Sequence, residues 1–130
     1  MCKECLKEKF FHFAHLVLEN REELGLSEED ARKIKELKIR TKKDLIRDKA
    51  EIEILAVDIF AKLWDEKADL EGINKLLDKK YDLKREGAKK FIQAFVTLKG
   101  SLTKEQMKKA KAICKASGKQ GEETGGKCCR

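Results

Sequence analysis

The chain has 130 residues, of which 42% are charged and 41% are hydrophobic, and it contains no proline. This length suits one domain with a modest core, and a proline-free chain rich in Lys, Glu, Leu and Ala favours an all-helical fold. The formal net charge is +7, unevenly spread: from Leu83 onward there are 13 basic and 4 acidic residues. This basic third predicts either salt-sensitive attraction to acidic proteins, anionic lipid or nucleic acid, or simply a solvated lysine-rich face.

Several classes of protein are disfavoured. No stretch approaches the ~20 apolar residues of a membrane span. The sequence has no glycine-rich phosphate loop, and its two histidines both lie near the N-terminus, so we expect a protein that is not an enzyme. The first residues do not have the pattern of a secretion signal. The protein is therefore expected either in the cytosol or in a compartment reached by a signal that has been removed.

Apolar spacing and capping residues predict four helices, over residues 6–24, 27–67, 69–99 and 103–114. Gly25 suits a left-handed C-cap after the first helix. Ser27 and the three acids that follow it suit the start of the second. Asp69 can cap the third, which two glycines weaken and which could bend near residues 81–87. Residues 1–116 then form a single domain, and the glycine-rich basic tail 117–130 is expected to be disordered.

The second predicted helix is long for a chain of this size. Its apolar residues keep nearly to a heptad grid, through Ile34, Thr41, Leu45, Ile52, Leu55, Ile59 and Leu63. At 1.5 Å per residue this helix would measure roughly 60 Å. We therefore expect an elongated helical hairpin of four helices, with the long second and third helices side by side, rather than a compact globule.

The same capping pattern precedes the second and the fourth predicted helices. The later copy consists of Leu102, Thr103 and Gln106. It is a capping box, in which the Thr and Gln side chains can satisfy each other's backbone amides. The earlier copy consists of Leu26, Ser27 and Asp30. Its capping role survives the replacement of Thr by Ser and of Gln by Asp, because both side chains suit a helix start.

Two such motifs on either side of a long helical hairpin resemble the LTxxQ signature of the Spy/CpxP family of periplasmic stress proteins, which includes the metal-responsive ZraP-like and CnrX-like proteins. The resemblance covers roughly residues 24–113. It implies a periplasmic protein, with its signal peptide removed, that forms an antiparallel, cradle-shaped homodimer. Members of the family act as ATP-independent chaperones, as regulators of envelope stress or as metal-responsive sensors.

The second helix carries more apolar residues than one stripe of a hairpin requires. The surplus residues are Ile39, Ile46, Ile54, Val57, Phe60 and Trp64. Three interpretations remain open: an ordinary core covered by the first and fourth helices, the interface of a homodimer, or a surface that contacts client proteins. Client contact is the least favoured for Trp64, because an exposed tryptophan promotes aggregation.

Possible metal ligands gather near the N-terminus, as Cys2, Cys5, His12 and His15. These residue types suit zinc or another transition metal. Along a continuous helix, however, Cys5 and His12 lie two turns, about 10.5 Å, apart. One site would then need an unwound N-terminus or ligands from a second subunit, and Glu19, Glu22 or Glu23 could complete it. The CnrX-like proteins carry a histidine pair in their first helix, usually spaced HxxxH rather than HxxH.

The same residues also have plainer interpretations. The histidines can be ordinary surface or core residues. In an oxidising periplasm the cysteines near the N-terminus can form a disulfide with each other or with the C-terminal pair Cys128 and Cys129. Because the chain has five cysteines, at least one is left over. Cys114, on the last helix, is expected to be a buried small apolar residue.

The sequence therefore predicts a periplasmic stress protein that binds unfolded or envelope proteins without ATP and acts as a homodimer, with a membrane-bound regulator as a possible further partner. One alternative is a metal sensor or metal-resistance protein of the same fold, binding zinc, nickel, cobalt or copper through the N-terminal residues. The other is a basic helical module that binds nucleic acid, which the scarcity of aromatic residues among the lysines disfavours.

Overall fold

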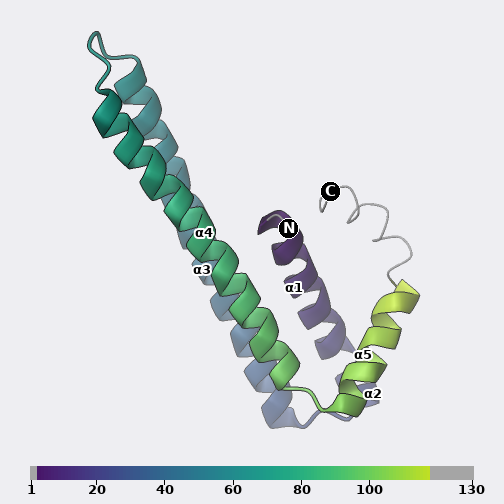
Figure 1. The fold of residues 1–130 in the computed structure, drawn as a ribbon. Coiled ribbons are helices and arrows are strands. Elements are labelled where there is room, and N and C mark those ends of the chain that lie inside the picture. The colour runs from purple at the N-terminus through teal and green to yellow at the C-terminus, as the bar shows by residue number, and fades with distance from the viewer. Residues whose placement is uncertain (1–2, 118–130) are drawn as a thin grey trace.

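The computed structural model describes residues 3–117, which form five helices and no strand. The helices are α1 (Lys3–Glu19), α2 (Arg21–Leu24), α3 (Glu28–Leu63), α4 (Leu70–Gly100) and α5 (Lys104–Ser117). Two of them, α3 and α4, are far longer than the others and run antiparallel side by side (Figure 1). The predicted all-α fold class is confirmed.

One hydrophobic core lies at one end of the molecule, where the short helices pack against the long pair (Figure 1). Helix α1 contacts both α3 and α4, and α5 contacts α1 and α2. Phe10 meets Phe91 edge-on with 6.3 Å between ring centroids, and Phe13 stacks on Phe95 at 5.5 Å. The largest fully buried side chains are Phe10, Ile34, Leu98 and Val17. We call this end, with α1, α2, α5 and the adjoining parts of α3 and α4 (residues 28–45 and 87–100), the base.

The long pair continues past the base as an arm, which we define as residues 46–86 (Figure 1). With 36 residues, α3 is about 54 Å long. Within the arm the buried side chains are Leu55 and Ile73, in the seam between the two helices. A two-helix pair buries one stripe of each helix and leaves the other faces to solvent. The arm therefore has no core apart from its seam.

The first predicted helix is interrupted in the structure, which makes the prediction of four helices wrong. Helix α1 ends at Glu19, and Asn20 separates it from α2, a single turn. The Asn20 side chain donates a hydrogen bond to the Leu16 carbonyl at 2.8 Å. An asparagine amide that binds the backbone in this way competes with the regular helix.

The left-handed cap predicted at Gly25 is confirmed, with a φ of 71°. The Gly25 amide donates to the Glu22 carbonyl and the Leu26 amide to the Arg21 carbonyl. These two bonds form a Schellman motif, which ends a helix most easily at glycine because an L-residue is strained at positive φ. The chain turns here from α2 into α3.

Other boundaries differ by a few residues. Helix α3 ends at Leu63 instead of residue 67, because acidic side chains such as Asp65 are unfavourable at the negative end of a helix dipole. Asp69 caps α4 as predicted and accepts a hydrogen bond from the Gly72 amide at 3.2 Å. Helix α4 then runs without interruption through residues 81–87, where a bend was considered. Helix α5 extends to Ser117 instead of residue 114.

Some predictions concern residues outside the described range. Cys2 and the predicted disordered tail from residue 118 onward lie there. Within residues 3–117, no helix combines the length and the apolar character that crossing a membrane requires.

Candidate binding surface

The two predicted capping motifs both lie in the base. At the start of α3, Ser27 Oγ accepts a hydrogen bond from the Asp30 amide at 3.1 Å. At the start of α5, the Thr103 amide donates to Gln106 Oε1 at 2.9 Å, and the Gln106 amide donates to Thr103 Oγ1 at 3.2 Å. The later motif is thus a complete capping box, whereas the earlier one provides one of its two bonds.

A hydrogen bond joins the neighbourhoods of the two motifs. Gln106 Nε2 donates to the Gly25 carbonyl at 3.3 Å, across 81 residues of sequence. Leu26 and Leu102, which precede the two helices, both pack against the base core. The motifs therefore connect the turn before α3 to the turn before α5, a role that the sequence pattern did not predict.

Gln106→Ala is expected to lower the free energy of unfolding by about 1–2 kcal/mol, because it removes the return bond of the capping box and the bond to Gly25. Gln106→Glu keeps the acceptor for the Thr103 amide and should lower the free energy of unfolding by less. Urea unfolding followed by circular dichroism measures both, with the exposed Gln93→Ala as the matched control. Equal stability of Gln106→Ala and Gln93→Ala would contradict the role of this side chain.

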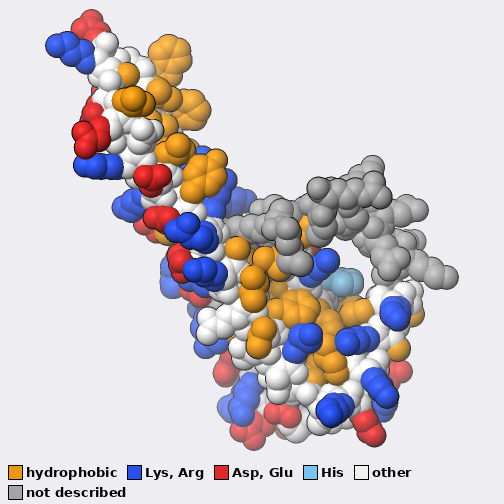
Figure 2. Space-filling view, in the orientation of Figure 1, with side chains coloured by type: hydrophobic (Ala, Val, Ile, Leu, Met, Phe, Trp, Pro, Cys, Tyr) orange, Lys and Arg blue, Asp and Glu red, His pale blue; other side chains and the backbone are white. Residues whose placement is uncertain are grey.

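Apolar side chains are exposed mainly on the arm. Of the twelve large apolar side chains that are exposed in residues 3–117, nine belong to the arm. Figure 2 shows apolar side chains gathered along the far part of the arm. The surplus residues predicted from the sequence are all exposed: Ile39, Ile46, Ile54, Val57, Phe60 and Trp64. Their interpretation as an intramolecular core is wrong, because α1 and α5 pack only at the base.

Part of this exposed surface forms a stripe on α3, which we call the α3 stripe. It consists of Ile39, Ile46, Val57 and Trp64, and Trp64 is 87% exposed. Successive members are 7, 11 and 7 residues apart. On a helix with 3.6 residues per turn, this spacing keeps all four within about 20° of one direction.

A second stripe, the α4 stripe, was not predicted. It consists of Leu70, Leu77 and Tyr81, which are spaced by seven and four residues and are all exposed. Lys84 Nζ lies 5.3 Å and Lys80 Nζ 6.0 Å from the centroid of the Tyr81 ring. Leu70 and Leu77 belong to the apolar periodicity of the third predicted helix, but periodicity alone does not show which of two adjacent stripes faces the other helix.

A shallow groove of about 660 Å³, the basic groove, lies in the base between α1 and α3. Its apolar lining consists of Phe11, Leu18 and Ile39. Its basic lining consists of Arg21, Lys35, Lys38, Lys42 and Lys43. No carboxylate lines the groove, and none of the five basic side chains belongs to an ion pair within residues 3–117. The lysines are evident in the sequence, but the contribution of α1 follows only from the fold.

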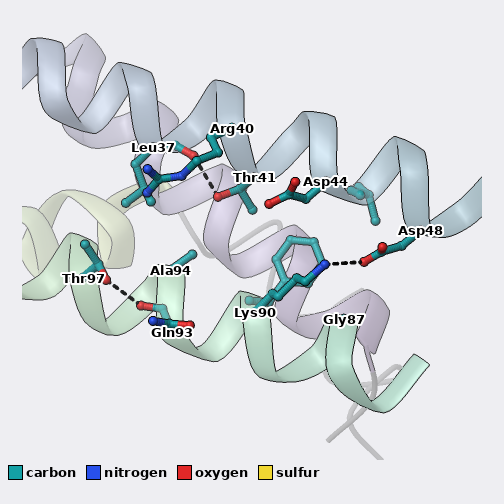
Figure 3. A pocket seen from close by; sticks show the side chains of 12 residues that line it. Leu37, Arg40, Thr41, Asp44, Asp48, Gly87, Lys90, Gln93, Ala94 and Thr97 are labelled. Carbon is teal, nitrogen blue, oxygen red and sulfur yellow. Dashed lines mark hydrogen bonds and ion pairs between the residues drawn. The ribbon is translucent and has the colours of Figure 1, made fainter. Parts of the chain in front are cut away.

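A smaller cavity of about 250 Å³ lies between α3 and α4, where the arm joins the base (Figure 3). Lys90 Nζ and Asp48 Oδ2 form an ion pair at 3.3 Å across it. The Thr41 hydroxyl donates to the Leu37 carbonyl of its own helix at 2.7 Å. The small residues Gly87 and Ala94 line the α4 side. We assign a structural role to this cavity, because its polar side chains bond either to their own helix, as Thr41 does, or across the seam, as Lys90 and Asp48 do.

The candidate metal ligands do not converge within the described residues. Cys5 is buried at 2% exposure, whereas His12 and His15 are exposed. His15 Nε2 lies 3.2 Å from Glu19 Oε1. Within residues 3–117, no three side chains of His, Cys, Asp and Glu lie close enough together to bind one metal ion. A site that includes Cys2 concerns residues outside that range and stays a prediction.

Cys114 lies on α5, half-buried beside the base core. Burial raises the pKa of its thiol, because an apolar environment disfavours the thiolate. The thiol thus packs against the core as a small apolar residue, although it is half-buried and not fully buried as the sequence predicted.

The chain matches no protein-family model, no curated protein and no solved structure. The resemblance to the Spy/CpxP family thus depends on the capping motifs and the helix order, and it stays a prediction.

Proposed function

We propose that this protein is a periplasmic, non-enzymatic stress protein that binds unfolded proteins without ATP. The observation that carries the proposal is the arm, on which apolar side chains stand exposed on two faces of a long and narrow helical pair. Monomeric soluble proteins rarely expose contiguous apolar patches larger than a few hundred Å², and such patches usually mark interaction sites.

The chemistry of the arm suits weak contacts with many sequences. Its exposed apolar residues alternate along both helices with charged ones, as in Lys80–Tyr81–Asp82. The lysines beside Tyr81 can cover the ring or move away from it, since an exposed cation–π contact is worth only about 0.5–1 kcal/mol. A surface of this kind binds apolar segments and releases them without an energy source.

The proposal includes the homodimer that the family resemblance implies. An 87% exposed Trp64 beside three further exposed residues of the α3 stripe is an aggregation hazard in a lone chain. A second copy would cover part of this surface and leave the rest to clients.

The test is suppression of aggregation of a chemically unfolded model protein, at stoichiometric ratio and without nucleotide. The wild type should reduce light scattering, and Leu77→Ser with Tyr81→Ser should reduce it less, because this variant makes the α4 stripe polar without touching the core. The control is Asn74→Ser with Asp78→Ser, two exposed polar residues on the same helix. A wild type that leaves scattering unchanged would rule out the chaperone function. Equal protection by both double variants would place the client surface elsewhere.

No observation favours either alternative function to the same degree. The metal sensor would need ligands that residues 3–117 do not bring together. The nucleic-acid module would use the basic groove, but among the described residues that line it Phe11 is the one aromatic side chain on which a base could stack.

A further inference from the structure

The two ends of α3 carry complementary surfaces. At the base, the basic groove combines three apolar side chains with five cations that form no ion pair within residues 3–117. At the far end of the arm, residues 64–71 combine exposed Trp64 and Leu70 with four acidic residues and one lysine. We call this segment the tip. Both surfaces therefore present apolar side chains, and their charges are of opposite sign.

We propose that the tip of one copy docks into the basic groove of a second copy, so that two chains associate antiparallel along their α3 stripes. The tip cannot reach the groove of its own chain, because Ile39 lies on α3 and Trp64 is the C-cap of the same helix, about 37 Å away. This inference rests on the homodimer of the proposed function and specifies its contacts.

The spacing of the α3 stripe supports a second copy as the occupant. The intervals of 7, 11 and 7 residues read the same from either end. A copy that runs in the opposite direction therefore places Ile39 against Trp64 of the second copy, and Ile46 against its Val57. The two-fold axis then falls between residues 51 and 52, so both tips meet both grooves at once. Self-complementarity of this kind is the signature of a two-fold symmetric interface.

The charges agree with the same register. Lys38 and Asp65 of the second copy then lie at the same level along the paired helices, since both are one residue from the paired stripe positions. Asp65 and Glu66 belong to no ion pair within residues 3–117, and neither do the lysines of the groove. Complementary potentials fix register and orientation even when each exposed pair contributes little energy. An unrelated acidic partner would explain the groove, but it would leave the symmetric spacing without a role.

Charge reversal tests the contact, with sedimentation velocity as the measurement. The groove variant is Lys35→Glu with Lys38→Glu and Lys42→Glu, and the tip variant is Asp65→Lys with Glu66→Lys. The groove variant then carries three acidic and two basic side chains in the groove, and the tip variant carries three lysines and two acids in the tip. Each variant alone puts like charges together at both ends, and should weaken association by about a hundredfold. In a mixed dimer, the acidic groove of the groove variant faces the basic tip of the tip variant. At the other end, the basic groove of the tip variant faces the acidic tip of the groove variant. The mixture should therefore form a heterodimer although each variant alone is monomeric. Circular dichroism of the separate variants checks that they remain folded.

Three outcomes would overturn the inference: a wild type that is monomeric at micromolar concentration, variants that stay dimeric, or folded variants that do not associate when mixed. Variants that stay dimeric would assign the homodimer to another face. A monomeric wild type that binds an acidic, apolar peptide in the groove would assign the groove to a foreign partner. None of these measurements uses a client, so the scattering assay can fail or succeed independently of them.

Discussion

Phe10→Ala is expected to lower the free energy of unfolding by about 3–5 kcal/mol. The Phe10 side chain is completely buried. Its ring lies 5.2 Å from that of Phe11 and 6.3 Å from that of Phe91, measured between centroids. Truncation leaves a cavity between α1 and α4 that the surrounding helices fill only in part. Since a domain of this size has a total stability of about 5–15 kcal/mol, the variant should be close to unfolding at ambient temperature.

The matched control is Phe60→Ala on the arm. Phe60 is 61% exposed, so its truncation should change the stability by no more than about 0.5 kcal/mol. Urea unfolding followed by helical circular dichroism measures both variants under the same conditions. A similar loss for the two would mean that Phe60 is covered in solution, or that the base is not the stable part of the molecule.

Amide hydrogens of the arm are expected to exchange with solvent at least about a hundredfold faster than those of the base, which corresponds to a difference of about 3 kcal/mol in opening free energy. The reason is the distribution of buried side chains. The base buries apolar faces of all five helices, whereas the arm buries a single seam around Leu55 and Ile73. Exchange followed by mass spectrometry on the tip variant gives the comparison without the proposed association.

Two further variants separate the arm from the base in this experiment. Leu55→Ala should speed exchange in the arm and leave the base unchanged, because Leu55 packs only within the seam. Leu98→Ala should speed exchange throughout, because Leu98 is fully buried in the base core. Uniform protection of base and arm in the tip variant would contradict the proposal that the arm opens independently.

The fold follows from the sequence to the level of helices and their order. Proline-free amphipathic periodicity predicts the two long helices, and the residues Gly25, Ser27 and Asp69 mark where helices end or begin. The break at Asn20 escaped prediction, because the apolar spacing of α1 continues across it through Val17 and Leu24. Local hydrogen bonding of one amide determines the break, and periodicity does not include it.

The candidate surface follows from the sequence only in part. The α3 stripe was identified as surplus, because a two-helix hairpin needs one apolar stripe on each helix. Its exposure could not be decided, because the reach of α1 and α5 along the arm depends on tertiary packing. The α4 stripe and the basic groove escaped prediction for the same reason. Leu77 fits the seam as well as the surface by period, and Phe11 joins the lysines of α3 only in the folded chain.

The distance in sequence between contacting residues grows steadily from the tip to the base. Asp48 and Lys90, where the arm meets the base, are 42 residues apart, whereas Phe10 and Phe91 are 81 apart. The contacts in the arm close short loops but bury little apolar surface. The contacts in the base bury the most apolar surface, but they join residues far apart in the sequence and therefore form more slowly. During synthesis α1 is made first, and its partners on α4 and α5 are made last. The apolar face of Phe10, Phe13 and Val17 can therefore meet α3 early, but it is fully covered only after α4 and α5 have emerged, which exposes the growing chain to aggregation until then.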